Sequence, residues 1–247
     1  MGTRGLYGFR KNGVDKTTYN HFDSYPDGLG ADVINFIKKH SIDELKKFYD
    51  RIQMVQEDAT PTKEEIKTCV DAGLCDLSVS TQSTNDWYCL LRNIQGNLDA
   101  LYNSPVAYMI DNSDFIKDSL FCEYAYIIDL DVKILEFYVG FQHEPSILNR
   151  YGTKSDNGYY PCKMVSFYPL ETMNEHSVEE YVNDMANMQS IAVPDFSDVT
   201  ASVVSQLEGK GMGNVTVENH YDSLLTVEGN VDKDALPGLE DILKRSY

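Results

Sequence analysis

Residues 3–22 read TRGLYGFRKNGVDKTTYNHF, with two strand-like runs on either side of an Asn-Gly pair. Residues 3–9 and 17–22 are rich in apolar, aromatic and β-branched side chains, which is typical of strands. Asn12-Gly13 between them is a dipeptide that favours a tight hairpin turn. The segment therefore predicts an N-terminal β-hairpin, and we expect this hairpin to begin the sheet of the fold.

A turn and several helices are predicted after the hairpin. Residues 25–28, Tyr-Pro-Asp-Gly, combine a proline that presets φ with a glycine that accepts a positive φ. An apolar stripe predicts a helix over 31–39, and capping boxes at Ser41 and Thr62 predict the starts of two more. Evenly spaced leucines and isoleucines predict a buried helical stripe over 85–101.

The second half of the chain turns to strands. Apolar and aromatic runs predict strands over 124–130, 133–140 and 163–168, and a further capping box at 177–180 predicts a helix. The strands follow a block of helices and do not alternate with single helices. This order predicts an α+β fold, in which a mainly antiparallel sheet packs with the hairpin against several helices.

The character of the sequence shifts near residue 192. We expect a main α+β domain over 1–192 and a small acidic C-terminal subdomain or extension over 193–247. Within the second part, the pattern predicts short strands over 214–218 and 223–227 and a last helix over 239–245.

The chain is strongly acidic. It has 21 Lys+Arg against 39 Asp+Glu, which gives a net charge of −18 and a pI of about 4.5. This charge repels nucleic-acid phosphates and attracts basic protein surfaces, so direct nucleic-acid binding is not expected. Neither a membrane span nor a signal peptide is recognisable in the sequence. We therefore expect a cytoplasmic protein with reduced cysteines, and we expect Cys122 and Cys162 to be core residues.

Polar and aromatic side chains crowd into the N-terminal segment. The candidate ligand-binding residues are Thr3, Arg4, Tyr19, His21, Asp23 and Tyr25. Pairing of the hairpin strands would bring them together. An arginine fork suits a carboxylate or phosphate, a histidine can exchange a proton near neutral pH, and tyrosines offer stacking faces with hydroxyl tips. The alternative is a closed network in which Arg4 pairs with Asp23 and holds the turn.

Other chemistries have weaker support. The glycines at 28–30 precede a predicted helix, where backbone N–H groups can bind an anion, although such pairs most often serve turn geometry. A hydrolase would use His21 as base and Asp23 as its orienter, or Thr3 after trimming of the chain. The histidines and carboxylates lack metal-ligand spacing, so neither a metal nor a cofactor is expected. The residues leave open whether the chain is an enzyme.

Several stretches resemble a known family. Residues 1–4, MGTR, and 19–30, YNHFDSYPDGLG, resemble a family of largely uncharacterised proteins that is common in bacteriophages and bacteria. EYAYIIDLD at 123–131, with residues 135–141 and 168–170, also fits its pattern. The resemblance implies a phage accessory protein in the host cytoplasm, with counter-defence as the expected role. It transfers no catalytic or binding residue.

Three functions follow as hypotheses. The favoured one is a non-catalytic protein whose N-terminal site binds a small polar or nucleotide-like ligand. The second is an interaction protein whose acidic surface blocks a host factor, and the third is a hydrolase with an N-terminal site. The sequence does not determine the oligomeric state.

Overall fold

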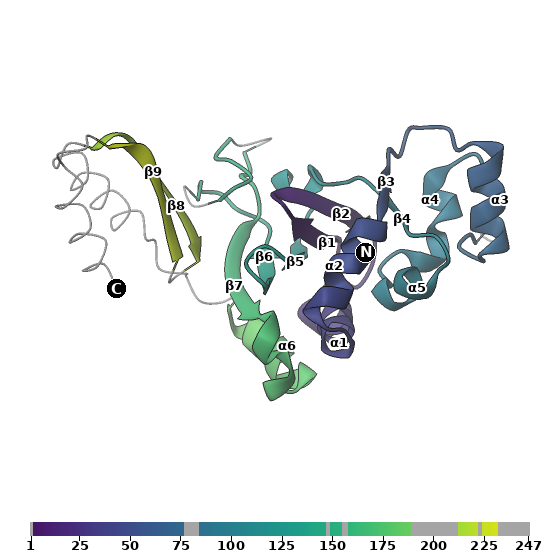
Figure 1. The fold of residues 1–247 in the computed structure, drawn as a ribbon, viewed down its shortest axis with the longest axis horizontal. Helices are drawn as coiled ribbons and strands as arrows, with labels where there is room; N and C mark the ends of the chain where they lie inside the picture. Colours follow the sequence, from purple (N-terminus) through teal and green to yellow (C-terminus); the bar gives the residue numbers. More distant parts are fainter. Residues whose placement is uncertain are drawn as a thin grey trace. The chain divides into compact units, whose positions relative to one another are not determined.

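The computed structural model describes residues 2–76, 84–146, 149–154, 158–188, 212–221 and 224–231. The chain forms two compact units, Met1–Pro145 with Tyr151–Ala192 and Ser146–Arg150 with Val193–Tyr247. In Figure 1 the first unit runs from purple to green, and the strands of the second are yellow. The candidate site lies entirely in the first unit.

A five-stranded mixed sheet forms the centre of the first unit, in the order β2-β1-β5-β6-β7. Its strands are β1 Gly5–Lys11, β2 Val14–Asn20, β5 Tyr124–Asp129, β6 Ile134–Val139 and β7 Lys163–Pro169. β1 and β5 pair in parallel, and the other neighbours are antiparallel. The predicted α+β fold, with an N-terminal hairpin and a mainly antiparallel sheet, is confirmed.

The hairpin turn has the geometry that its sequence predicts. Asn12 and Gly13 have φ values of 53° and 73°, and two positive values are the mark of the tight turn that matches strand twist. Both amides donate to the carboxylate of Asp131, at 2.7 and 2.9 Å. The turn is therefore held by a residue that follows β5, far along the chain.

The α-helices of the described residues all pack on one face of the sheet. The helices are α1 Ala31–Lys39, α2 Ile42–Arg51, α3 Lys63–Asp71, α4 Trp87–Leu90, α5 Leu98–Asn103 and α6 Val178–Met188. The shorter helical turns are η1 Pro26–Gly30, η2 Arg92–Ile94, η3 Phe115–Lys117 and η4 Leu170–Glu175, and β3 Gln53–Val55 pairs in parallel with β4 Tyr108–Ile110. Ser41 and Thr62 form complete capping boxes at the starts of α2 and α3, as predicted.

The predicted stripe over 85–101 is buried but is not one helix. α4, η2 and α5 follow one another as separate pieces. Gly96 between them has φ of 73°, and a left-handed residue ends an α-helix. Its amide donates at 2.8 Å to the hydroxyl of Tyr7 on β1. The prediction of a continuous helix is therefore wrong, and the break creates a loop that faces the hairpin.

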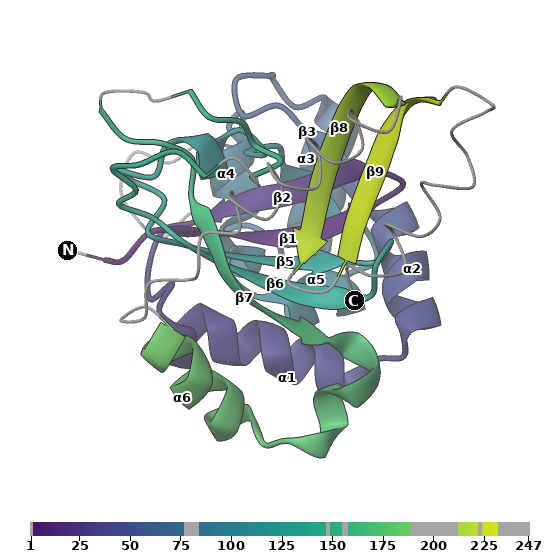
Figure 2. The ribbon, with the colours of Figure 1, turned by 90° about the vertical axis from the view of Figure 1, so that its left-hand side faces the viewer.

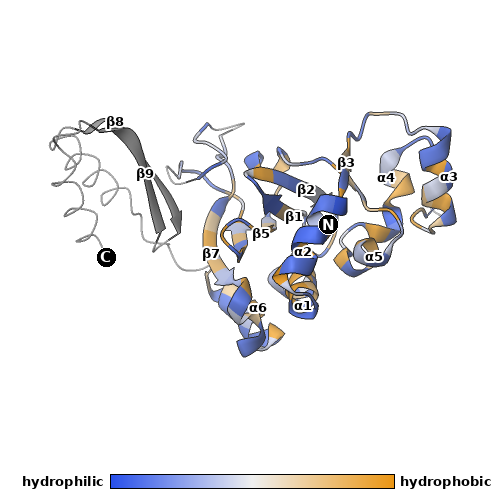
Figure 3. Cartoon of the chain, viewed as in Figure 1, coloured by the Kyte–Doolittle hydropathy of each residue, from blue (hydrophilic) through white to orange (hydrophobic). Residues whose placement is uncertain are grey.

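Two hydrophobic clusters lie on opposite faces of the sheet. Tyr7 and Phe9 of β1 belong to the larger cluster, with the apolar stripes of α1 and α2. Leu6 points the other way and packs with Cys122 and Cys162, which are buried as predicted. Alternation along the strands produces the two faces. Figure 2 shows α1 and α6 lying together along the sheet. Figure 3 shows that the helices carry both apolar and polar residues.

In the second unit, β8 Met212–Tyr221 and β9 Leu224–Val231 form an antiparallel pair. They include most of the predicted strand residues of this region. The predicted helix over 239–245 lies outside the described residues, and the domain division at residue 192 stays a prediction. No helix in the described part of the chain combines the length and apolar character needed to cross a membrane.

Candidate functional site

The predicted site residues lie where β1 begins and β2 ends. Gly5 pairs with Asn20 at this end of the hairpin, and the amide of Ser24 donates to the carbonyl of Thr3 at 3.3 Å. The residues that flank the two strands are therefore close in space. Thr3 itself is only 3% exposed and lies inside the fold.

Tyr19 and His21 contact each other directly. The Tyr19 hydroxyl and His21 Nδ1 are 2.7 Å apart. Burial lowers the pKa of His21, and the positive charges of Arg92 and Arg4 lower it further, so its ring is neutral at pH 7. Burial raises the pKa of Tyr19. The result is a hydrogen-bonded Tyr19–His21 pair whose neutral form is favoured by two nearby arginines.

Arg4 takes part in contacts other than those of the predicted closed network. Its guanidinium carbon lies 5.2 Å from the centroid of the Phe121 ring, and its backbone amide donates to the Glu123 carboxylate at 3.1 Å. In the part of the chain that the structure describes, no ion pair joins Arg4 to Asp23. The arginine therefore does not hold the turn through that carboxylate.

Asp23 and Tyr25 belong to the turn that follows the hairpin. Asp23 has φ of 52°, and its carbonyl accepts a hydrogen bond from the amide of Leu29 at 2.9 Å. Tyr25 is 47% exposed, and its ring packs against that of Tyr124 with centroids 5.8 Å apart. The six predicted residues thus occupy several environments and do not form one pocket.

The backbone amides of η1 are already hydrogen-bonded. Gly28 and Gly30 donate to the carbonyl of Tyr25, at 3.0 and 3.2 Å, and Leu29 donates to the carbonyl of Asp23. An anion at a helix start needs amides that point at it. The idea of an anion site at residues 28–30 is therefore not supported by the geometry.

A cleft of about 500 Å³ lies between this turn and the loop that breaks the predicted helical stripe. Its lining residues are Asn20, Phe22, Asp23, Asp27, Gly28, Leu29, Asp32, Arg92, Gln95 and Gly96. Asp23 is the one member of the predicted set among them. We refer to this hollow as the hairpin-end cleft.

The opposite side of the hairpin-end cleft, across from the turn, is formed by Arg92, Gln95 and Gly96. Arg92 donates to the hydroxyl of Tyr88 and to Oε1 of Gln95 at 3.3 Å. Its guanidinium carbon also lies 5.1 Å from the Tyr88 ring centroid. A guanidinium held by a ring and two acceptors has a defined position, so the cleft has a fixed cationic end.

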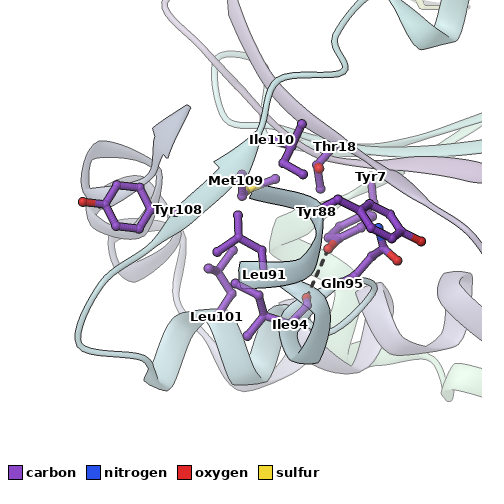
Figure 4. Close-up of a pocket in the computed structure, with 10 residues that line it drawn as sticks. All are labelled: Tyr7, Thr18, Tyr88, Leu91, Ile94, Gln95, Leu101, Tyr108, Met109 and Ile110. Atoms are coloured by element: carbon purple, nitrogen blue, oxygen red, sulfur yellow. Dashed lines mark hydrogen bonds between the residues drawn. The ribbon is translucent and has the colours of Figure 1, made fainter. Parts of the chain in front are cut away.

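Tyr7 fixes the loop to the sheet. Its hydroxyl accepts the Gly96 amide at 2.8 Å and donates to the carbonyl of Ile94 at 3.4 Å. Figure 4 shows this phenol beside Tyr88 and Gln95, at a small pocket of about 20 Å³. Such a volume has room for about one water molecule. The small pocket is therefore too narrow for an organic ligand, and the hairpin-end cleft is the candidate site.

The side of the hairpin-end cleft that is formed by the turn after the hairpin and by α1 is acidic. Asp23, Asp27 and Asp32 face one cation, Arg92. Burial raises the pKa of Asp32, the charge of Asp99 raises it further, and Lys39 opposes this shift. Among the described residues, no group of three or more histidines, cysteines and carboxylates could hold a metal ion. These carboxylates therefore line a surface and do not converge on one point.

A second acidic hollow, of about 610 Å³, is lined by Gln56, Glu57, Asp58, Asp86, Asp111 and Asn112. Three of its carboxylates have hydrogen-bond partners, and Glu57 accepts from Nδ2 of Asn112 at 3.5 Å. Asp86 accepts the amides of Tyr88 and Cys89 at the start of α4, and Asp111 accepts from Ser113. The hydrogen bonds of Asp86 and Asp111 stabilise local turns, so this hollow is the weaker candidate.

Sequence reasoning missed most of the residues of the hairpin-end cleft. It places Arg92, Gln95 and Gly96 within a continuous buried helix. One signal against that helix is present, because an isolated glycine is unfavourable inside a helical pattern. Comparison with protein families, with curated proteins and with solved structures finds no match for this chain.

Proposed function

We propose that this chain is a non-catalytic protein that binds a small polar ligand in the hairpin-end cleft. The observation that carries the proposal is the cleft itself, which has a volume of about 500 Å³ and a polar, charged lining. Small-molecule sites have volumes of roughly 300–1,000 Å³. The hydrogen bonds of Tyr7 to the 94–96 loop give the cleft a rigid wall without a ligand, which lowers the ordering cost of binding.

The contacts of His21 favour binding over hydrolysis. A general base needs an orienting partner and access to a substrate proton. The Nδ1 of His21 is hydrogen-bonded to Tyr19, whereas Asp23 lies in the cleft wall. Thr3, the other proposed nucleophile, is buried. The roles that a hydrolase would need are therefore not assembled.

The resemblance of the N-terminal segment to phage proteins supplies a setting for this proposal. A phage accessory protein that acts in counter-defence can work by sequestering a small host molecule. Sequestration requires a pocket and no chemical step, which is consistent with the arrangement around His21. Inhibition of a host protein through the acidic surface stays a prediction, and no particular contact favours it.

A steric variant tests the proposal without assuming the charge of the ligand. A Cβ at Gly96 would lie 2.5 Å from Oδ1 of Asn20, inside the cleft wall. Gly73 has a similar φ, 71°, with nothing within 4 Å of its Cβ position. Both alanine variants carry backbone strain of about 1 kcal/mol or more. Only Gly96→Ala obstructs the cleft.

Calorimetry with nucleosides, nucleotides, amino acids, sugars and polyamines should show binding of at least one class by the unaltered chain. Gly73→Ala should retain that binding, and Gly96→Ala should weaken it at least about tenfold, because 1.4 kcal/mol of lost contact is a factor of ten. Phe22→Ala, at a residue that is 52% exposed, is the second test if Gly96→Ala does not fold. Equal affinity in all variants, or no binding at all, would rule out the proposal.

A further inference from the structure

Asn20 presents an unused acceptor to the hairpin-end cleft. The residue is buried, with 6% of its surface exposed. Its Nδ2 donates to the carbonyl of Phe22 at 2.5 Å and to the hydroxyl of Ser24 at 2.8 Å. These bonds turn Oδ1 toward Gly96, where it lines the cleft. No described donor reaches Oδ1, and this atom is not among the fully buried polar atoms that lack a partner. It therefore opens onto the cleft, where a ligand or water can donate to it.

The three carboxylates of the cleft are also acceptors without a cationic partner. Asp23, Asp27 and Asp32 form no ion pair with any described residue. Lys39 is the cation that acts on Asp32 from nearby, but its ammonium pairs with Asp99 at 2.5 Å. The side of the cleft that carries these three aspartates therefore offers negative charge and hydrogen-bond acceptors.

The single cation of the cleft lining does not balance this charge. The guanidinium of Arg92 already donates hydrogen bonds to Tyr88 and Gln95. The cleft lining holds three carboxylates against this one positive charge. The start of α1 would ordinarily attract an anion. Here the preceding amides are bonded within the turn, and Asp27 and Asp32 supply negative charge at that helix start. A phosphate in this cleft would meet net repulsion.

A single metal ion does not satisfy these acceptors either. In the described part of the chain no three carboxylates, histidines or cysteines are close enough to share one ion. Acceptors distributed along a wall fit a molecule whose donors are distributed in the same way. Phe22 in the cleft lining is 52% exposed, and an aromatic ring offers its face to an organic cation.

We propose that the ligand of the hairpin-end cleft is an organic cation with several N–H donors, of the polyamine or guanidino type. This inference rests on the proposed binding function. Its charged groups contact Asp23, Asp27 and Asp32. One N–H group donates to Oδ1 of Asn20, and the chain of the ligand lies against Phe22. The cleft thereby rejects nucleotides and inorganic phosphate.

Charge variants test the sign of the ligand. With spermidine and agmatine as probes, Asp27→Asn and Asp32→Asn should each weaken binding about tenfold, since the lost hydrogen bond to a charged group changes affinity on that order. Arg92→Met should tighten binding, because it removes the repulsive cation. An anionic ligand would give the opposite response to both kinds of variant.

The second acidic hollow supplies the matched control. The double variant Glu57→Gln, Asp58→Asn removes two charges outside the cleft and should leave the affinity unchanged at about 0.15 M salt, where distant surface charges are screened. An equal loss in this control would show that the cation is only a counterion of an acidic protein, and would overturn the inference. Binding of AMP or inorganic phosphate that Arg92→Met abolishes would overturn the inference while keeping the proposed function. Failure of spermidine and agmatine to bind would overturn the inference alone, whereas failure of every class in the calorimetry panel above would remove the proposed function as well.

Discussion

His21 shows how neighbouring residues change the chemistry of one side chain. The sequence marks it as a group that titrates near neutral pH, with an ordinary pKa of about 6.5. The structure places it against Tyr19 and within reach of two arginines. Burial together with these charges lowers its pKa. The residue that most resembles a catalytic base in the sequence is therefore a neutral partner of a tyrosine in the fold.

This environment predicts the titration of His21. NMR of the imidazole ring should give a pKa below about 6.5 in the folded chain, and Arg92→Met and Arg4→Met should each raise it. His21 binds a proton less readily in the folded chain than in the unfolded chain. It should therefore destabilise the fold as the pH falls below the pKa that His21 has in the unfolded chain. A pKa that does not respond to either arginine variant would contradict the assignment.

At the scale of elements, local signals predict the starts of α2 and α3. Thr62 begins α3 through a complete capping box, in which its hydroxyl accepts the Glu65 amide at 3.2 Å and the Glu65 carboxylate accepts the Thr62 amide at 2.7 Å. These contacts span three residues, so they are readable from the sequence. The break at Gly96 involves a hydrogen bond to Tyr7, 89 positions away, and no local pattern contains that partner.

The cap predicts a measurable loss of stability. Thr62→Ala should lower the free energy of unfolding by about 1 kcal/mol, whereas Thr60→Ala, at an exposed position just before the cap, should leave it unchanged. The hydrogen bonds from Thr62 lower the pKa of Glu65, so the part of the cap that the Glu65 carboxylate makes is present at neutral pH and is lost as the pH falls through that pKa. Urea titrations at pH 7 and in mild acid measure both effects. Equal stability of the two variants would refute the role of the cap.

At the scale of the whole molecule, the described core lies within the first unit. The members of both hydrophobic clusters fall between Leu6 and Met185. β7, η4 and α6 contribute to the larger cluster, through Tyr168, Met173 and Met185 among others. A stable sheet needs these elements, because burial of apolar surface is the main favourable term in folding.

Truncation tests this division. A chain that ends at residue 192 should retain the far-ultraviolet circular dichroism of the first unit and unfold cooperatively on heating. A chain that ends at residue 162 should not, because it loses five buried core side chains, Tyr168, Leu170, Met173, Tyr181 and Met185. Non-cooperative unfolding of the longer of these two chains would show that the second unit is required for the core.

The net charge is a property of the whole molecule, and it does not predict the location of the candidate site. A net charge of −18 predicts repulsion of nucleic acid and attraction of basic partners. It does not predict where the carboxylates gather. Asp23, Asp27 and Asp32 become one wall because the turn after the hairpin and the first turn of α1 are adjacent, and Arg92 lines the same cleft.

The features that the sequence determines by itself are those whose partners are close along the chain. The Asn12-Gly13 turn, the capping boxes of α2 and α3 and the alternating faces of β1 belong to this group, because backbone geometry and periodicity act over a few residues. The parallel pairing of β1 with β5, the break at Gly96 and the hairpin-end cleft depend on contacts between distant segments. Such contacts are decided by packing of the entire core, so only the tertiary structure brings Arg92 to the turn and leaves Arg4 without an ion pair to Asp23.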